Sequence, residues 1–168
     1  MSQDDALPTY SFVPGGPWPH PHRGKPPSRP GEGVAPVVGD DWRASADYTH
    51  GIRLFNAGYY WEAHEAWEGL WHAHGRHGPT ADVLKGLIKL AASGVKVRER
   101  QAWGVASHAR RAADLFEAVQ AGGAPIMLGL DLEVMAAIAR RVAANPPVDD
   151  SPEGAVVVRV FDFEIDPS

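Results

Sequence analysis

The sequence predicts an all-α protein: a compact bundle of about five antiparallel helices, with an extended Pro-rich N-terminal arm and a short β-prone C-terminal tail. Three observations favour this fold class. Apolar residues recur at helical spacing in successive segments, Gly and Pro separate those segments, and nine of the fifteen prolines precede residue 40. The 168-residue chain therefore divides into an arm (1–39), a helical domain (40–146) and a tail (147–168).

The arm is too rich in Pro and Gly for regular helix or sheet, so it is expected to be extended. It carries four apolar residues that could lie along a groove: Tyr10, Phe12, Val13 and Trp18. It also carries His20 and His22, which an extended backbone points to the same side. That pair is compatible with a metal, or it is incidental in a Pro-rich segment.

Apolar stripes place the helices. The first is expected over residues 42–55, capped by Asp40 or Asp41, and the second over about 60–73 after an Asn56–Gly58 turn. The next three are expected over about 81–100, 102–120 and 131–144. In the helix over 81–100, the residues expected to be buried are Leu84, Leu87, Ile88, Ala91 and Val95. In the helix over 102–120 they are Val105, Ala109, Ala112, Phe116 and Val119, and in the helix over 131–144 they are Val134, Met135, Ile138 and Val142.

The second helix has an unusual polar face. At about 100° per residue, His64, Glu65, Glu68 and His72 fall within an arc of about 100°, beside a wide aromatic stripe. Such an arc is expected to be partly buried, and buried carboxylates need partners or shifted pKa values. Glu62, Ala66, Gly69 and Ala73 are expected to face solvent on the far side. The alternative is that the acids form only ordinary i,i+4 pairs on a wet surface.

The candidate site draws on two helices and the turn. Lys85 and Lys89 of the third helix are potential counter-ions for Glu65 and Glu68, or else part of a solvated edge. Asn56, Tyr60 and Trp61, from the same stretch as His64, complete the set of candidate site residues.

These residues also carry a resemblance to a known family. The first motif consists of Phe55, Asn56, Gly58, Tyr60, Glu62, Ala63, His64, Glu65, Glu68 and Trp71. Together with residues 84–92 it resembles the bacterial family known as domain of unknown function 309, over about residues 48–115. The resemblance implies a small all-helical domain and supplies no activity, cofactor or catalytic residue.

Two hypotheses of function remain open. The first is a binding or scaffold module that holds a small ligand or a protein partner at the Glu/His/Lys site. The second is a metal-dependent hydrolase, with His64 and Glu68 as ligands of a divalent metal and Glu65 as general base. His72, and with it His20 or His22 of the arm, are candidate further ligands of such a mononuclear site. The segment differs from the His-Glu-x-x-His motif of metalloproteases, because Glu68 replaces the second His.

The composition of the chain argues against several kinds of site and partner. The absence of Cys excludes disulfides and thiolate metal sites. A formal net charge of −5 argues against nucleic-acid binding, and no apolar run approaches the ~20 residues of a membrane span. The N-terminus has no signal-peptide pattern, so a cytoplasmic protein is expected. The β-prone residues 155–165 are expected to lie extended over the helices or to pair with a second copy. This apolar tail and the small residues of the helix expected over 102–120 make a homodimer one expectation.

Overall fold

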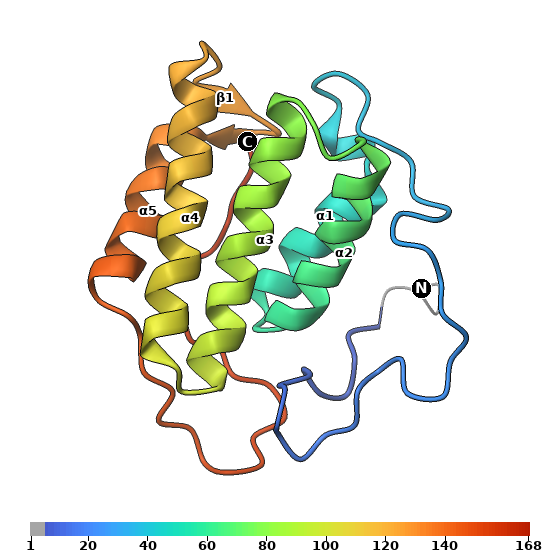
Figure 1. Cartoon of the computed structure of the whole chain (residues 1–168), viewed down its shortest axis with the longest axis vertical. Coiled ribbons are helices and arrows are strands. Elements are labelled where there is room, and N and C mark those ends of the chain that lie inside the picture. Colours follow the sequence, from blue (N-terminus) through green and yellow to red (C-terminus); the bar gives the residue numbers. More distant parts are fainter. Residues whose placement is uncertain (1–5) are drawn as a thin grey trace.

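The computed structural model describes residues 6–168, and it confirms the all-α fold class. Five α-helices in this part of the chain pack into a compact bundle in which consecutive helices run in opposite directions (Figure 1). They are α1 (Ala46–Asn56), α2 (Tyr60–Ala73), α3 (Pro79–Arg98), α4 (Ala102–Ala121) and α5 (Leu132–Ala144). None of these helices has the length and apolarity needed to cross a membrane.

Helix α3 is the centre of the bundle. It packs between α2 and α4, and twelve of its twenty residues are buried. All five residues expected on its apolar stripe are buried, and so are the five expected on α4. Burial of a broad apolar face is what stabilises such helices, since propensity alone is weak.

The start of the first helix differs from the prediction. Residues Trp42–Ala44 form a short 3₁₀ helix, and α1 begins only at Ala46. Ser45 is the N-cap residue and its hydroxyl accepts a hydrogen bond from the Tyr48 N–H at 3.3 Å. Asp41 makes no capping bond, so the prediction of Asp40 or Asp41 as the cap was wrong. The Trp42 ring packs edge-on against Tyr48, with ring centroids 6.0 Å apart.

A two-stranded hairpin that the sequence did not predict precedes α5. Strands β1 (Ile126–Met127) and β2 (Leu130–Asp131) are antiparallel, with Met127 opposite Leu130. Leu128 and Gly129 both have positive φ, as a tight two-residue hairpin turn requires. The Tyr48 hydroxyl donates a 2.7 Å hydrogen bond to the Leu128 carbonyl and so ties the turn to α1.

Helix α5 begins after Asp131, whose carboxylate accepts hydrogen bonds from the N–H groups of Glu133 and Val134. The structure thus confirms the predicted start of this helix at Asp131. Val134 itself is 52% exposed, so its predicted burial was wrong. Met135 and Val142 are buried as predicted, and Ile138 is half-buried. The buried stripe is completed by Leu132, Ala136 and Ala139.

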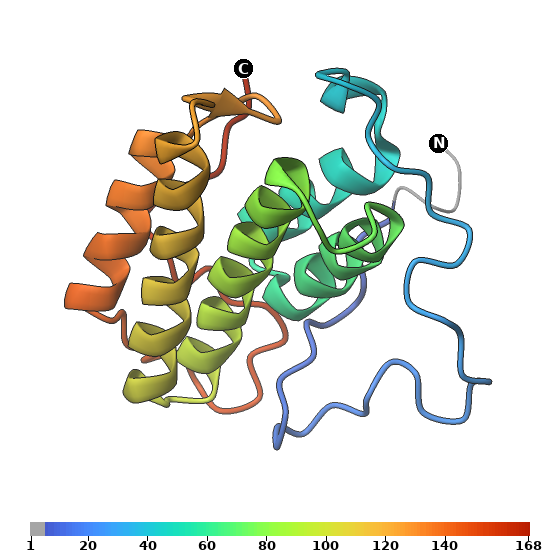
Figure 2. The same cartoon turned by 45° about the horizontal axis from the view of Figure 1, so that its top comes forward.

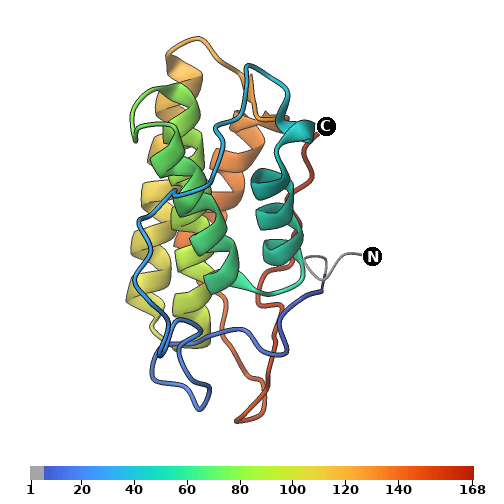
Figure 3. The same cartoon turned by 90° about the vertical axis from the view of Figure 1, so that its right-hand side faces the viewer.

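The arm runs along the side of the bundle next to α2 (Figure 2) and passes in front of that helix when this side faces the viewer (Figure 3). The Ser11 hydroxyl and the Phe12 N–H donate to the two carboxylate oxygens of Glu62, at 2.6 and 3.0 Å. Further along, the Val37 N–H donates to His74 Nε2 at 3.0 Å. The expectation that Glu62 and its neighbours face solvent was therefore wrong, because the sequence pattern of a helix does not show what an arm covers.

The tail runs extended behind α3, between α1 and α5 (Figures 1 and 3). Phe161 and Ile165 are buried, and both backbone groups of Ile165 bond to the side-chain amide of Asn56 at 2.8 Å. The Val160 N–H donates to the Tyr60 hydroxyl at 3.0 Å. The tail thus takes the first of its two predicted paths, extended over the helices of its own chain.

Candidate functional site

Helix α2 brings three potential ligands together. His64 and Glu68 lie one helical turn apart, with His64 Nε2 3.4 Å from Glu68 Oε2. On the other side of the ring, His64 Nδ1 lies 3.5 Å from Glu65 Oε1. The imidazole therefore stands between two carboxylates. We call His64, Glu65 and Glu68 the α2 cluster.

The α2 cluster has the compactness of a metal site. One ligand atom from each side chain can be chosen so that all three lie within 4.8 Å of one another. Within residues 6–168, it is the only group of three or more His, Cys, Asp or Glu side chains with this property. The side chains are 27%, 40% and 36% exposed, so the cluster is open to an ion from solvent.

The charge state of Glu65 follows from its neighbours. The adjacent His64 imidazole lowers the pKa of Glu65, burial acts in the opposite direction, and His22 adds a smaller lowering effect. The net direction is downward, so Glu65 is ionised throughout the neutral range. An ionised carboxylate is the form that ligates a metal.

The arm adds aromatic and imidazole side chains next to the cluster. The rings of Phe12, His20 and His22 all contact Trp61, with centroids 5.2 to 5.8 Å from the indole. His22 reaches further, and its Nε2 lies 3.6 Å from Glu65 Oε2. Trp61, a predicted site residue, is therefore the α2 side chain against which the arm packs, next to the α2 cluster.

A hollow of about 670 Å³ lies between the arm and α2. Its walls come from arm residues 22–32 and from the outer face of α2. Charged and imidazole side chains of both signs line it: His22, Lys25, Arg29, Glu65 and Glu68. Two members of the α2 cluster thus lie at a recess that the arm creates.

In the described part of the chain, the two predicted counter-ions make no direct ion pair with the acids of the α2 cluster, although the charge of Glu68 acts on Lys89. Lys85 Nζ sits 4.0 Å from the centroid of the Trp71 ring, which is a cation–π contact. Lys89 is half-buried, and burial lowers its pKa, with the positive charges of Lys85 and Arg111 acting in the same direction and the negative charge of Glu68 acting against them. Among the described residues, neither lysine comes within ion-pair distance of Glu65 or Glu68. The groups next to Glu65 and Glu68 are instead the imidazoles of His64 and His22.

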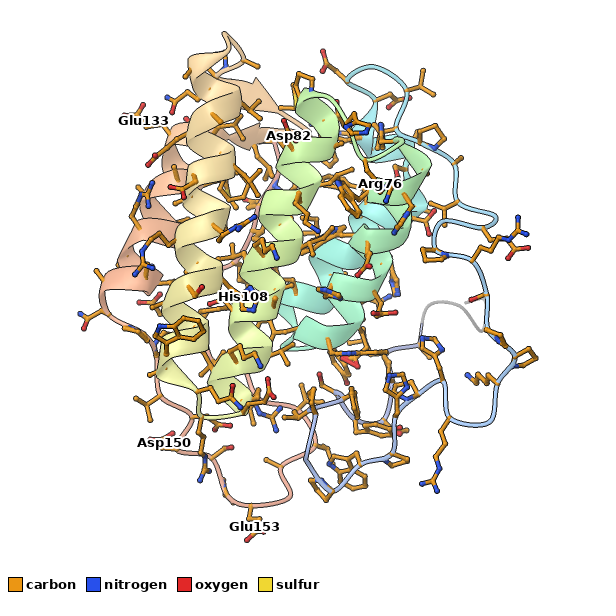
Figure 4. The ribbon with its side chains drawn as sticks, viewed as in Figure 1. Arg76, Asp82, His108, Glu133, Asp150 and Glu153 are labelled. Atoms are coloured by element: carbon orange, nitrogen blue, oxygen red, sulfur yellow. The ribbon has the colours of Figure 1, made fainter. Side chains whose placement is uncertain are left out.

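His108 of α4 is a further titratable neighbour of the site, which was not among the predicted site residues. It is half-buried and lies over α3 in Figure 4. Burial lowers its pKa, and the charges of Lys89, Lys96, His64 and Arg111 act in the same direction. One signal was present in the sequence, because His108 lies three residues after Val105 and four before Ala112, both on the predicted apolar stripe.

The remaining predicted site residues serve other contacts. Asn56 and Tyr60 hold the tail through the hydrogen bonds described above. His72 is half-buried with its ring 5.1 Å from that of Trp71, and it lies outside the α2 cluster. Of the predicted metal ligands, the structure therefore brings together His64 and Glu68, and it adds Glu65.

Comparisons with known proteins bear on the helical part of the chain. No match was found among curated proteins or among solved structures. Residues 48–108 match a family model, from α1 to the first part of α4. This segment includes the α2 cluster and excludes both the arm and the tail. The chain thus resembles, over residues 48–108, the family described as Domain of unknown function (DUF309).

Proposed function

We propose that this protein is a binding module whose α2 cluster holds a divalent metal ion. One observation carries the proposal: His64, Glu65 and Glu68 present three ligand atoms within 4.8 Å of one another. The distance of 3.4 Å between His64 Nε2 and Glu68 Oε2 also matches the separation of two ligands on one metal ion. Two ligands bound at about 2.1 Å with tetrahedral angles lie about 3.4 Å apart.

The ligand types indicate the class of ion. One imidazole nitrogen and two carboxylate oxygens form a mixed set, which suits Zn²⁺, Mn²⁺ or Fe²⁺. Ca²⁺ and Mg²⁺ prefer oxygen ligands alone, and the imidazole of His64 occupies the centre of the cluster.

A binding role has more support than hydrolysis. A general base needs an oxygen that faces the attacking water. Both oxygens of Glu65 face imidazoles, Oε1 at 3.5 Å from His64 and Oε2 at 3.6 Å from His22. This arrangement turns neither oxygen of Glu65 toward a free water, which weakens the case for Glu65 as a general base. A cytoplasmic location and a small-molecule or protein partner remain parts of the proposal that rest on the sequence alone.

The test is metal binding by the untagged full-length protein. We expect mass spectrometry to find a stoichiometric first-row metal, and calorimetric titration of the metal-free protein with Zn²⁺ to give one site. His64→Ala and Glu68→Gln should each weaken Zn²⁺ binding by at least about tenfold. His77→Ala is the matched control, because His77 is exposed beyond the end of α2 and should leave affinity unchanged.

Two results would overturn the proposal. One is a wild-type protein that takes up no metal in either measurement. The other is Zn²⁺ binding that survives in His64→Ala and Glu68→Gln but is lost in His77→Ala, which would place the ion at the exposed His residues after α2. Circular dichroism melts of each variant would verify that the helices are intact.

A further inference from the structure

We infer that His22 of the arm is an additional ligand of the same ion, so that metal binding fastens the arm to α2. The inference rests on the proposed metal binding by the α2 cluster and names how the site is completed. It concerns a residue outside the segment matched by the family model, which begins at residue 48.

The position of His22 carries the inference. Its Nε2 lies 3.6 Å from Glu65 Oε2, close to the separation of about 3.4 Å expected for two ligands on one tetrahedral ion. His22, Glu65 and Glu68 also line the same hollow. His22 lies outside the group whose ligand atoms are within 4.8 Å of one another, so its exposed ring would turn toward the ion to complete the site. The His22 side chain is 57% exposed and needs little desolvation to bind.

His20 provides the natural comparison. It belongs to the same short segment, and its ring contacts Trp61 as that of His22 does. Its Nδ1, however, accepts a hydrogen bond from the His22 backbone N–H at 3.1 Å, and its ring also packs against Phe12. Of the two histidines, His22 alone reaches the acids of α2 in this structure.

The arm is already attached on both sides of His22. Before it, Ser11 and Phe12 bond to Glu62, and after it, Val37 bonds to His74. The hollow lies beneath the span between these attachments. A metal bridge from His22 to α2 would divide that span and restrict residues 22–32. By reciprocity, a restrained arm would hold the metal more tightly.

The experiment compares three full-length proteins: wild type, His22→Ala and the matched control His20→Ala. Zn²⁺ titration of the metal-free proteins should show affinity weakened about 10- to 100-fold in His22→Ala and little changed in His20→Ala. Hydrogen exchange should report the arm directly. Zn²⁺ should slow exchange in residues 22–32 of the wild type and of His20→Ala, and should leave that segment unchanged in His22→Ala.

The outcomes separate this inference from the proposed function. A wild type that binds no Zn²⁺ would overturn both. Equal affinity and equal arm protection in wild type and His22→Ala would overturn only the role of His22 and leave the α2 cluster as the site. Equal losses in His20→Ala and His22→Ala, with no loss in His64→Ala, would mean that the arm chelates the ion by itself, and that would also overturn the inference.

Discussion

At the scale of single residues, Arg98 and Asp149 form the most buried ion pair among the described residues. Arg98 Nε donates to Asp149 Oδ2 at 3.1 Å, and the two side chains are 9% and 4% exposed. Burial alone would raise the pKa of Asp149. Hydrogen bonds from Ser151 and the charge of Arg98 outweigh that effect, so the pKa of Asp149 lies below its ordinary value of 3.8.

We therefore predict that Asp149→Asn lowers the free energy of unfolding at pH 7 by about 3–5 kcal/mol, because it leaves the guanidinium buried without a counter-charge. A carboxyl group with a lowered folded-state pKa stabilises the fold above its ordinary pKa of 3.8 and loses this effect as the pH falls below it. The difference between wild type and variant should shrink below about pH 4. Urea unfolding between pH 7 and pH 3 measures it, and a constant difference would contradict an ionic origin.

The sequence predicted the relative positions of site residues correctly where both residues lie on one helix. The i,i+4 spacing of His64 and Glu68 determines that they share a face, and the structure places them 3.4 Å apart. The partners of Glu65 were not accessible in this way. His22, which lies next to Glu65, belongs to an arm whose path depends on long-range contacts. Lys85 makes a cation–π contact with the Trp71 ring instead of an ion pair with a carboxylate.

At the scale of elements, two glycines set how closely α3 approaches its neighbours. A Cβ atom on Gly94 would lie 2.6 Å from Cγ of Tyr60 on α2. A Cβ atom on Gly86 would lie 2.6 Å from Cε1 of Phe116 on α4. Both rings are buried, so neither has free space into which it could move.

Gly86→Ala and Gly94→Ala should each lower the free energy of unfolding by about 1–3 kcal/mol through overpacking. This loss should exceed the gain of about 1 kcal/mol that Ala brings to a helix interior. Gly69→Ala in α2 is the matched control, since its Cβ would meet Val34 Cγ2 at an ordinary 3.5 Å. Urea unfolding should show Gly69→Ala neutral or stabilised, and equal gains in all three variants would refute tight packing at α3.

The elements that the sequence did not reveal are the short and irregular ones. The stripes of α3 and α4 are long enough for their period to identify them, and their burial was predicted correctly. Strands β1 and β2 have two residues each, too few for any alternation to be visible. The hairpin depends instead on the positive φ of Leu128, a conformation that sequence propensity disfavours for Leu.

At the scale of the whole molecule, the tail completes the core that the five helices leave open. Phe161 stacks on Phe55 with ring centroids 5.6 Å apart, and its edge meets Tyr60 at 5.2 Å. The predicted homodimer was based on this apolar tail and on the small residues of α4. Phe161 of the tail and Ala109 and Ala113 of α4 are buried in the core of one chain, and the homodimer stays a prediction.

The tail should consequently contribute to global stability like a core element. Phe161→Ala is expected to lower the free energy of unfolding by about 3–5 kcal/mol, because it opens a cavity between α1 and the tail. Val156→Ala is the control in the same segment, since Val156 is 43% exposed and uses only its backbone carbonyl to accept from Ser11. Urea unfolding followed by far-ultraviolet circular dichroism measures both. If Phe161→Ala unfolded at the wild-type midpoint while hydrogen exchange increased only in residues 156–168, the tail would be a detachable strap, and the helices would form a complete core by themselves.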